Sequence, residues 1–288
     1  MQLSDRALLV QLNVSQWTAR KFDKKATAEV AHAHGVNASV GRYNKSLLPL
    51  NDYLTNVHQK TGQIRTKYYD NTLPWGIEGT QMLPTANYLS FINDFRQEKA
   101  EWDTLVRLFL SNYTTLRADA KRFLGSLYRN EDYPNETDIA AKFRIDMAVF
   151  PVPTNDFRVQ IGADELSNIQ QDVERRVQEA SASAMKDVWQ RLYSKVEHLL
   201  DKMIKVDDPK SRFHESSIEH VQSLCELLPR LNFADDPHLE EMRHEVEIKL
   251  ASMSKDAIVG NDTFRATKID EAKAIMDKMA VFMGGFNV

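Results

Sequence analysis

Cysteine, glycine and proline are all scarce in this chain. There is one cysteine among 288 residues, Cys225, so no disulfide can form within the chain, and one thiol supplies neither a zinc site nor a redox pair. We therefore expect a reducing compartment. With only 10 Gly and 9 Pro, the chain has few residues that interrupt helices. This scarcity favours long helices over a β-sandwich with many turns.

Long apolar runs and targeting signals are also lacking. Residues 1–13 contain a short aliphatic stretch without a basic flank or a small-residue cleavage site, so they predict no signal peptide. No segment approaches the roughly 20 apolar residues that span a bilayer. The composition, 42% hydrophobic and 27% charged, is ordinary for a chain that folds. We expect a cytoplasmic protein that does not enter a membrane.

The common signatures of catalysis are missing. The sequence has no GxxxxGKS/T or GxGxxG phosphate loop and no GxSxG nucleophile elbow. Cys225 shares a predicted helical face with Ile218, Val221 and Leu228, which indicates a buried structural thiol rather than an activated one. We therefore expect that the protein is not an enzyme.

Two ExxH pairs raise the question of a metal site, because carboxylate-bridged di-metal bundles use two such pairs. The pairs are Glu29 with His32 and Glu241 with His244. The later helix has a predicted buried stripe that turns Glu241 and His244 toward water, formed by Leu239, Met242, Val246 and Leu250. We expect no bound metal and no cofactor.

Charge is unevenly distributed along the chain. Residues 1–130 contain 17 Lys and Arg against 11 Asp and Glu, whereas residues 131–288 contain 20 against 30. Such a chain could offer its basic half to a polyanion or pair head to tail with its own copies. Two clusters at helical spacing are candidates for contacts with a polyanion or a protein partner: Arg20, Lys21, Lys24, Lys25, Arg117, Lys121 and Arg122. The alternative is that they are ordinary solvated faces.

Hydrophobic periodicity predicts the regular elements. Residues 6–14 and 143–152 read as strands, and residues 157–161 would complete a hairpin with the second of these. Ser15 is a predicted N-cap for a helix running through Trp17, Ala19 and Phe22 to Gly35, with Asp23 as a candidate break. Residues 47–69 form a predicted helix, and residues 73–84 a loop in which Trp75 anchors onto the core.

Two very long helices dominate the prediction. Residues 85–129 and 165–205 each lack proline, and their apolar positions recur every 3.5 to 3.7 residues. At 1.5 Å per residue each helix would be roughly 60 Å long. Apolar side chains of the second helix fall on one stripe: Leu166, Ile169, Val173, Val177, Ala180, Ala184, Val188, Leu192, Val196, Leu199 and Met203.

Three shorter helices follow in the prediction. The first covers residues 216–228 and is closed by Pro229; the second opens at Asp236 and Pro237 and runs to about Met253; the third is capped by Asp262. The whole is an α+β fold, predominantly α-helical, with a small antiparallel β-sheet and a C-terminal helical bundle. We predict an elongated domain over residues 1–210 and a three-helix region over 211–288. Long helices of this kind should keep apolar surface that the rest of the chain does not cover, which predicts a homo-oligomer.

A resemblance to a family of uncharacterised proteins from tailed phages and some bacteria is carried by three segments: RALLVQLNVSQWTARKFD, DIAAKFRIDMAVFPVPTNDFRVQI and SAMKDVWQRLYSKVEHLLDKM. In that family a short strand precedes a W-S/T-x-R-K motif, matched here by Trp17, Thr18, Arg20 and Lys21. Members are often encoded near a MoxR-type AAA+ ATPase and a von Willebrand factor A protein. The resemblance implies a substrate or adaptor of such an ATPase in an infected cell, and it supplies no catalytic residue.

These observations predict a phage scaffold or adaptor that acts by binding itself or a phage ATPase. A DNA-binding accessory protein in phage replication or recombination is the alternative, and it would use the basic N-terminal half. The first hypothesis predicts more than one chain per particle in light scattering, and the second predicts binding to DNA that weakens steeply with salt.

Overall fold

The structure is a computed structural model that describes residues 2–154, 163–208 and 211–284. Most of it is helical, with a small four-stranded antiparallel sheet and a helical C-terminal region, so the predicted fold class is confirmed. Contacts divide the chain into two compact units. Unit 1 comprises residues 1–11, 68–92 and 148–288, and unit 2 comprises residues 12–67 and 93–147. Residue 210, the boundary predicted from the sequence, bounds neither unit.

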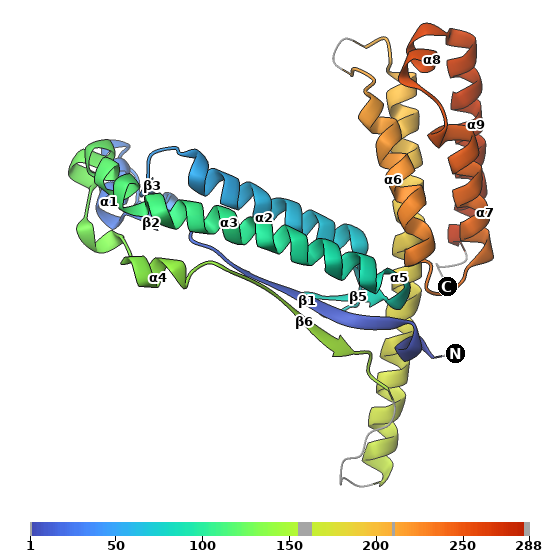
Figure 1. Cartoon of the computed structure of the whole chain (residues 1–288), viewed down its shortest axis with the longest axis horizontal. Helices are drawn as coiled ribbons and strands as arrows, with labels where there is room; N and C mark the ends of the chain where they lie inside the picture. The colour runs from blue at the N-terminus through green and yellow to red at the C-terminus, as the bar shows by residue number, and fades with distance from the viewer. Residues whose placement is uncertain (1, 155–162, 209–210, 285–288) are drawn as a thin grey trace. The chain divides into compact units, whose positions relative to one another are not determined.

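Figure 1 labels the elements, several of which pass from one unit into the other along the chain. The strands are β1 (Ala7–Ser15), β2 (Arg20–Phe22), β3 (Asn44–Ser46), β4 (Leu73–Pro74), β5 (Thr80–Pro84) and β6 (Arg144–Pro151). The main helices are α1 (Lys24–Ala33), α2 (Asp52–Asn71), α3 (Thr85–Leu124), α4 (Glu136–Ala140), α5 (Ala163–Ile204), α6 (Glu215–Leu231), α7 (Pro237–Val246), α8 (Lys255–Gly260) and α9 (Asp262–Gly284).

The sheet has the strand order β4-β5-β1-β6. Strands β1 and β6 confirm the strands predicted at residues 6–14 and 143–152, whereas the third predicted strand, Phe157–Ile161, lies outside the described residues. The loop predicted over residues 73–84 is wrong in part, because β4 and β5 form a hairpin there. Burial explains the difference: Leu73 and Met82 are fully buried partners across it. Trp75 is buried, as predicted for an anchor.

Unit 1 is built around the second half of α5, along which α6, α7 and α9 pack (Figure 1). Asp236 caps α7, as predicted, and its side chain also accepts a hydrogen bond of 2.9 Å from Trp189 Nε1 on α5. This contact joins the start of α7 to the core helix. The apolar positions of both helices then share one hydrophobic cluster.

Three predicted helix ends in unit 1 are wrong. Helix α6 continues past Pro229 to Leu231, whose fully buried side chain holds the last turn in place. Helix α7 ends at Val246 and is followed by a π-helical turn, η5 (Glu247–Ala251), and then by the separate helix α8. Asn261, and not Asp262, caps α9, because its side chain accepts the backbone N–H of Phe264.

Unit 2 contains the parts of α2 and α3 that run side by side (Figure 1). Trp102 on α3 donates a hydrogen bond of 2.8 Å to the hydroxyl of Thr61 on α2, and both side chains are buried. Ion pairs from Lys60 to Glu98 and Glu101 join the same two helices. The prediction of a helix starting at residue 47 is wrong by one turn, because the side chain of Asn51 caps the first turn at Leu54 N.

The helix predicted from Ser15 to Gly35 is wrong in its first half. Residues 20–22 form strand β2, which pairs with β3, and α1 begins only at Lys24, where Asp23 accepts the N–H of Ala26. Ser15 caps nothing; its hydroxyl donates to the carbonyl of Lys142. Ala19 has a φ of +52°, which is incompatible with a continuous right-handed helix through this position.

Candidate protein-interaction surface

Helix α5 changes its surroundings along its length. In the second half, the apolar positions predicted for the stripe are fully buried in the core of unit 1: Ala184, Val188, Leu192, Val196, Leu199 and Met203. In the first half, Leu166, Ile169, Val173 and Val177 follow at spacings of three and four residues but are only partly buried. We call these four side chains the α5 stripe. The helix therefore continues its apolar face beyond the helices that cover it.

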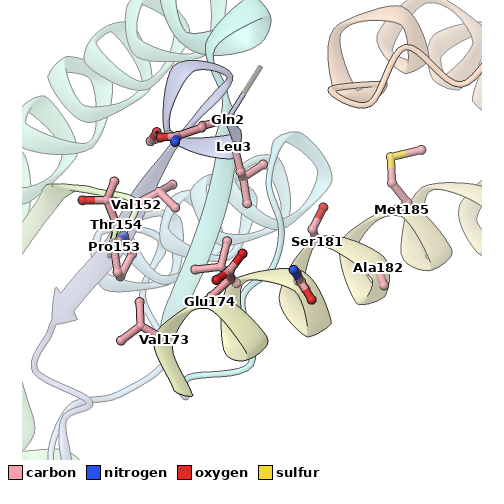
Figure 2. Close-up of a pocket in the computed structure, with 13 residues that line it drawn as sticks. Gln2, Leu3, Val152, Pro153, Thr154, Val173, Glu174, Ser181, Ala182 and Met185 are labelled. Carbon is pink, nitrogen blue, oxygen red and sulfur yellow. Dashed lines mark hydrogen bonds between the residues drawn. The ribbon is translucent and has the colours of Figure 1, made fainter. Parts of the chain in front are cut away.

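A hollow of about 590 Å³ lies against the α5 stripe. Leu3 comes from the short 3-10 turn η1 (Leu3–Asp5), Val152 and Pro153 follow strand β6, and Val173 and Val177 belong to α5. Figure 2 shows these segments bordering one space, with Glu174 and Ser181 on the same helix. We call this hollow the α5 groove.

A second hollow of about 520 Å³ shares Pro153, Val173 and Val177 with the α5 groove. Its other apolar side is the turn between β4 and β5, where Ile77 is 61% exposed. The two hollows together form a mainly apolar area on unit 1, and the charged side chains of Arg175, Arg176 and Glu179 lie at the second hollow. An area of this kind is typical of a surface that binds another macromolecule.

The lining of the α5 groove is mostly apolar and uncharged. Its polar lining consists of amide and hydroxyl side chains, and Glu174 is the one charged side chain among the described residues that line it. Ser4 and Ser181 have no histidine or lysine beside them in that lining to act as a base. The groove can therefore accept apolar side chains, and Glu174 can attract a cation at its edge.

Cys225 lies where the sequence predicts it, buried in the core of unit 1. Burial raises the pKa of its thiol to about 12, so the thiol stays protonated at neutral pH and is a poor nucleophile. Within the described ranges, no group of three or more His, Cys, Asp and Glu side chains is arranged to hold a metal ion. Glu29 of the first ExxH pair lies in an exposed ion pair with Lys25, and His244 of the second is 64% exposed.

All seven predicted basic contact residues lie in unit 2. Four have partners within the chain: Lys21 with Asp132, Lys25 with Glu29, Arg117 with Asn130 and Arg122 with Asp119. Three are exposed and have no ion pair or hydrogen bond with any described residue: Arg20, Lys24 and Lys121. Since Lys21 and Arg117 both contact residues 130–132, the structure brings one member of each predicted cluster to the same short segment.

A buried ion-pair network joins the strands of unit 2 to its helices. The Nζ of Lys45 on β3 lies 3.0 Å from Asp23 and 2.7 Å from Asp132, and it donates a further hydrogen bond of 2.7 Å to the carbonyl of Leu127. Asp132 also accepts from Lys21, and Asp23 caps α1 through the N–H of Ala26. We call Asp23, Lys45, Asp132 and Lys21 the Lys45 network.

The Lys45 network keeps its members charged. The N–H of Ala26 and the ammonium of Lys45 lower the pKa of Asp23 below its ordinary value. For Asp132 burial alone would raise the pKa, but the ammonium groups of Lys21 and Lys45 outweigh burial and lower it. Sequence reasoning missed this network, because its members are far apart in the chain and each looks like a surface charge on its own.

Comparisons with known proteins gave no match: no family model, no curated protein and no solved structure corresponds to this chain. Across the described part of the chain, no helix combines the length and the apolar character needed to cross a bilayer.

Replacing Lys45 with Met should lower the free energy of unfolding of unit 2 by about 3–5 kcal/mol, because Asp23 and Asp132 would stay buried without their shared cation. Pulsed hydrogen exchange in a urea series, read on peptides from α3 around Trp102, measures this change. Lys25→Met is the matched control, since Lys25 forms an exposed ion pair with Glu29 on α1; a loss below about 0.5 kcal/mol is expected there. Equal losses in both variants would contradict the role of the network.

Unit 2 should also lose stability in acid. Because the pKa values of Asp23 and Asp132 are lowered in the folded state, their contribution is complete above the unfolded value of about 3.9 and disappears as the pH falls through the lower folded values. The same urea series at pH 6 and pH 3 should show a lower midpoint for α3 peptides at pH 3. In Lys45→Met this difference should shrink, and an unchanged difference would argue against the assignment.

Proposed function

We propose that this protein is a non-enzymatic scaffold or adaptor that self-associates through the first half of α5. One observation carries the proposal: the α5 stripe extends past the core of unit 1 and is flanked by two apolar hollows. Apolar surface left in water costs roughly 25 cal/mol per Å², so a partner that covers it gains that free energy. Uncharged side chains around the α5 groove favour such a partner over a charged small molecule.

The setting we propose is the cytoplasm of a phage-infected cell. It follows from the resemblance of three long segments, among them the one that contains Trp17 and Arg20, to the tailed-phage family. That resemblance also suggests a second occupant for the same surface, a MoxR-type AAA+ ATPase. In both cases the surface binds a protein, either a second copy or the ATPase. Self-association can be tested with the purified chain alone.

Replacing Val173 with Glu should abolish self-association, because it places a carboxylate at the centre of the α5 stripe, where both hollows meet. Light scattering over micromolar concentrations should give more than one chain per particle for the wild type and one chain for the variant. Val281→Glu is the matched control, since Val281 is 75% exposed on α9 and lines neither hollow. A wild-type chain that stays monomeric would refute self-association.

DNA binding is the second candidate, and the charge of unit 2 favours it. The two segments of unit 2 contain 18 Lys and Arg against 13 Asp and Glu, and three exposed basic side chains there lack partners among the described residues: Arg20, Lys24 and Lys121. Phosphate contacts by such side chains make affinity fall steeply with salt.

This candidate predicts a gel shift with duplex DNA at low salt. Each phosphate contact adds about 0.9 to the slope of log affinity against log salt. The triple variant Arg20→Ala, Lys24→Ala, Lys121→Ala should reduce that slope by two to three. Arg144→Ala is the control for general loss of charge, because Arg144 on β6 pairs with Asp146. Absence of a shift by the wild type at low salt would remove the candidate.

A further inference from the structure

Unit 2 has an apolar hollow of its own. About 450 Å³ in volume, it lies between α1 and the segment that follows it, residues 34–43. Four large apolar side chains line it and are strongly exposed: Val40 at 73%, and Val30, Val36 and Tyr43 at 41–47%. We call this the α1 hollow. So many exposed aliphatic and aromatic side chains in one short stretch are unusual for a surface that meets only water.

Local hydrogen bonds hold the α1 hollow open. Thr27 on α1 accepts the backbone N–H of Tyr43, and its own hydroxyl donates to the carbonyl of Asp23. The N–H of Asp23 donates to the carbonyl of Tyr43, and the N–H of Val36 to that of Ala31, both at 2.9 Å. Gly35, with a φ of +64°, makes the turn that sends the chain back over α1. The exposed side chains are therefore presented on a fixed framework.

Among the described residues that line the α1 hollow, Arg42 is the one Lys, Arg, Asp or Glu. Arg42 lines it and lies 5.0 Å over the ring of Phe22, which is itself 41% exposed. Lys24 is exposed at the start of α1 and has no ion pair with a described residue, whereas the nearest acid on that helix, Glu29, is already paired with Lys25. A partner for this surface should therefore combine apolar side chains with negative charge.

The first half of α5 has that combination. Its partly buried apolar residues form the α5 stripe, and the acidic side chains Glu165 and Glu174 have no ion pair with any described residue. The two arginines nearby, Arg175 and Arg176, are already bound to Asp172 and Glu179. The net charges of the two units have opposite signs as well. Unit 1 is acidic, with 19 Lys and Arg against 28 Asp and Glu, and unit 2 is basic.

We propose that the α1 hollow of one copy binds the α5 stripe of a second copy. This inference rests on the proposed self-association and specifies its form: the contact is heterologous, between two different surfaces, and not a symmetric pairing of two α5 helices. The stripe alone offers only four partly covered side chains, which is little compared with the 1,200–2,000 Å² that stable interfaces bury. A hollow on the partner covers the stripe from more sides and also neutralises Glu165 and Glu174.

A heterologous contact leaves one free surface of each kind on every pair, so assembly continues into a ring or an open chain. The average particle mass should therefore exceed that of a dimer as concentration rises. A symmetric α5 pair would stop at two chains. High salt should weaken the assembly, because part of the attraction is between exposed charges.

Two full-length variants, each defective in one surface, test the contact. Val40→Glu adds a like charge to the α1 hollow against the acidic stripe, and Val173→Glu disrupts the stripe. Each variant alone should be monomeric in light scattering. Mixed in equal amounts they should form a dimer and nothing larger, because the mixture retains one intact hollow and one intact stripe. Dimer formation by the mixture also shows that both variants are folded.

The matched control for the hollow is Leu50→Glu, since Leu50 is 96% exposed in unit 2 and does not line the hollow; it should assemble like the wild type. If Val40→Glu assembles normally and only Val173→Glu is monomeric, the contact is symmetric, so this inference fails while the proposed function stands. A monomeric wild type refutes both. If Val40→Glu assembles normally but loses binding to phosphatidylserine vesicles, the hollow is a lipid surface and the inference is wrong.

Discussion

Helix α5 has an apolar stripe that is longer than the set of helices packed along it. From Ala184 to Met203 every stripe position is buried in the core cluster that includes α6, α7 and α9, whereas Leu166, Ile169, Val173 and Val177 continue the same periodicity and are only partly buried. A helix in water keeps an apolar face only at a cost in free energy. The first half of α5 should therefore be the least stable part of the helix in an isolated chain and should gain most from a partner.

Unit 2 depends on a different interaction, the buried Lys45 network. Three hydrogen-bond donors of one ammonium group meet Asp23, Asp132 and the carbonyl of Leu127. Because Asp23 is also the N-cap of α1, the network determines where that helix starts. Helix α1 in turn provides one wall of the α1 hollow. The position of an exposed apolar surface thus follows from a buried charge cluster in the same unit.

Much of the fold could be predicted from residue patterns. Strand β1 is a run rich in Leu and Val, β6 begins with apolar residues at alternate positions, and α3 and α5 have long helical periodicity broken in α3 only at Lys99, so local sequence determines them. Strands β2 and β3 could not be found this way. They have three residues each, and their pairing depends on the burial of Lys45, a residue whose usual place is the surface. The hairpin of β4 and β5 was missed because two glycines and two prolines suggested a plain loop.

The candidate surfaces were only half visible in the sequence. The sequence predicts the apolar face of α5 over its whole length, but periodicity does not tell which part of that face is buried by other elements of the chain. The α1 hollow was missed, since Val30, Val36 and Val40 fit neither a helical nor a strand period across the turn at Gly35. Of the seven predicted basic contacts, Lys21 belongs to the Lys45 network. This pairing could not be predicted, because its partner Asp132 is more than a hundred residues away in sequence.

Hydrogen exchange of the full-length chain at two protein concentrations would show whether the first half of α5 is covered by a second copy. As concentration rises, backbone amides from Leu166 to Val177 and from Val30 to Tyr43 should both gain protection, while those from Ala184 to Met203 should stay unchanged. If exchange in the first half of α5 is independent of concentration, the uncovered stripe does not cause association, and the account is contradicted.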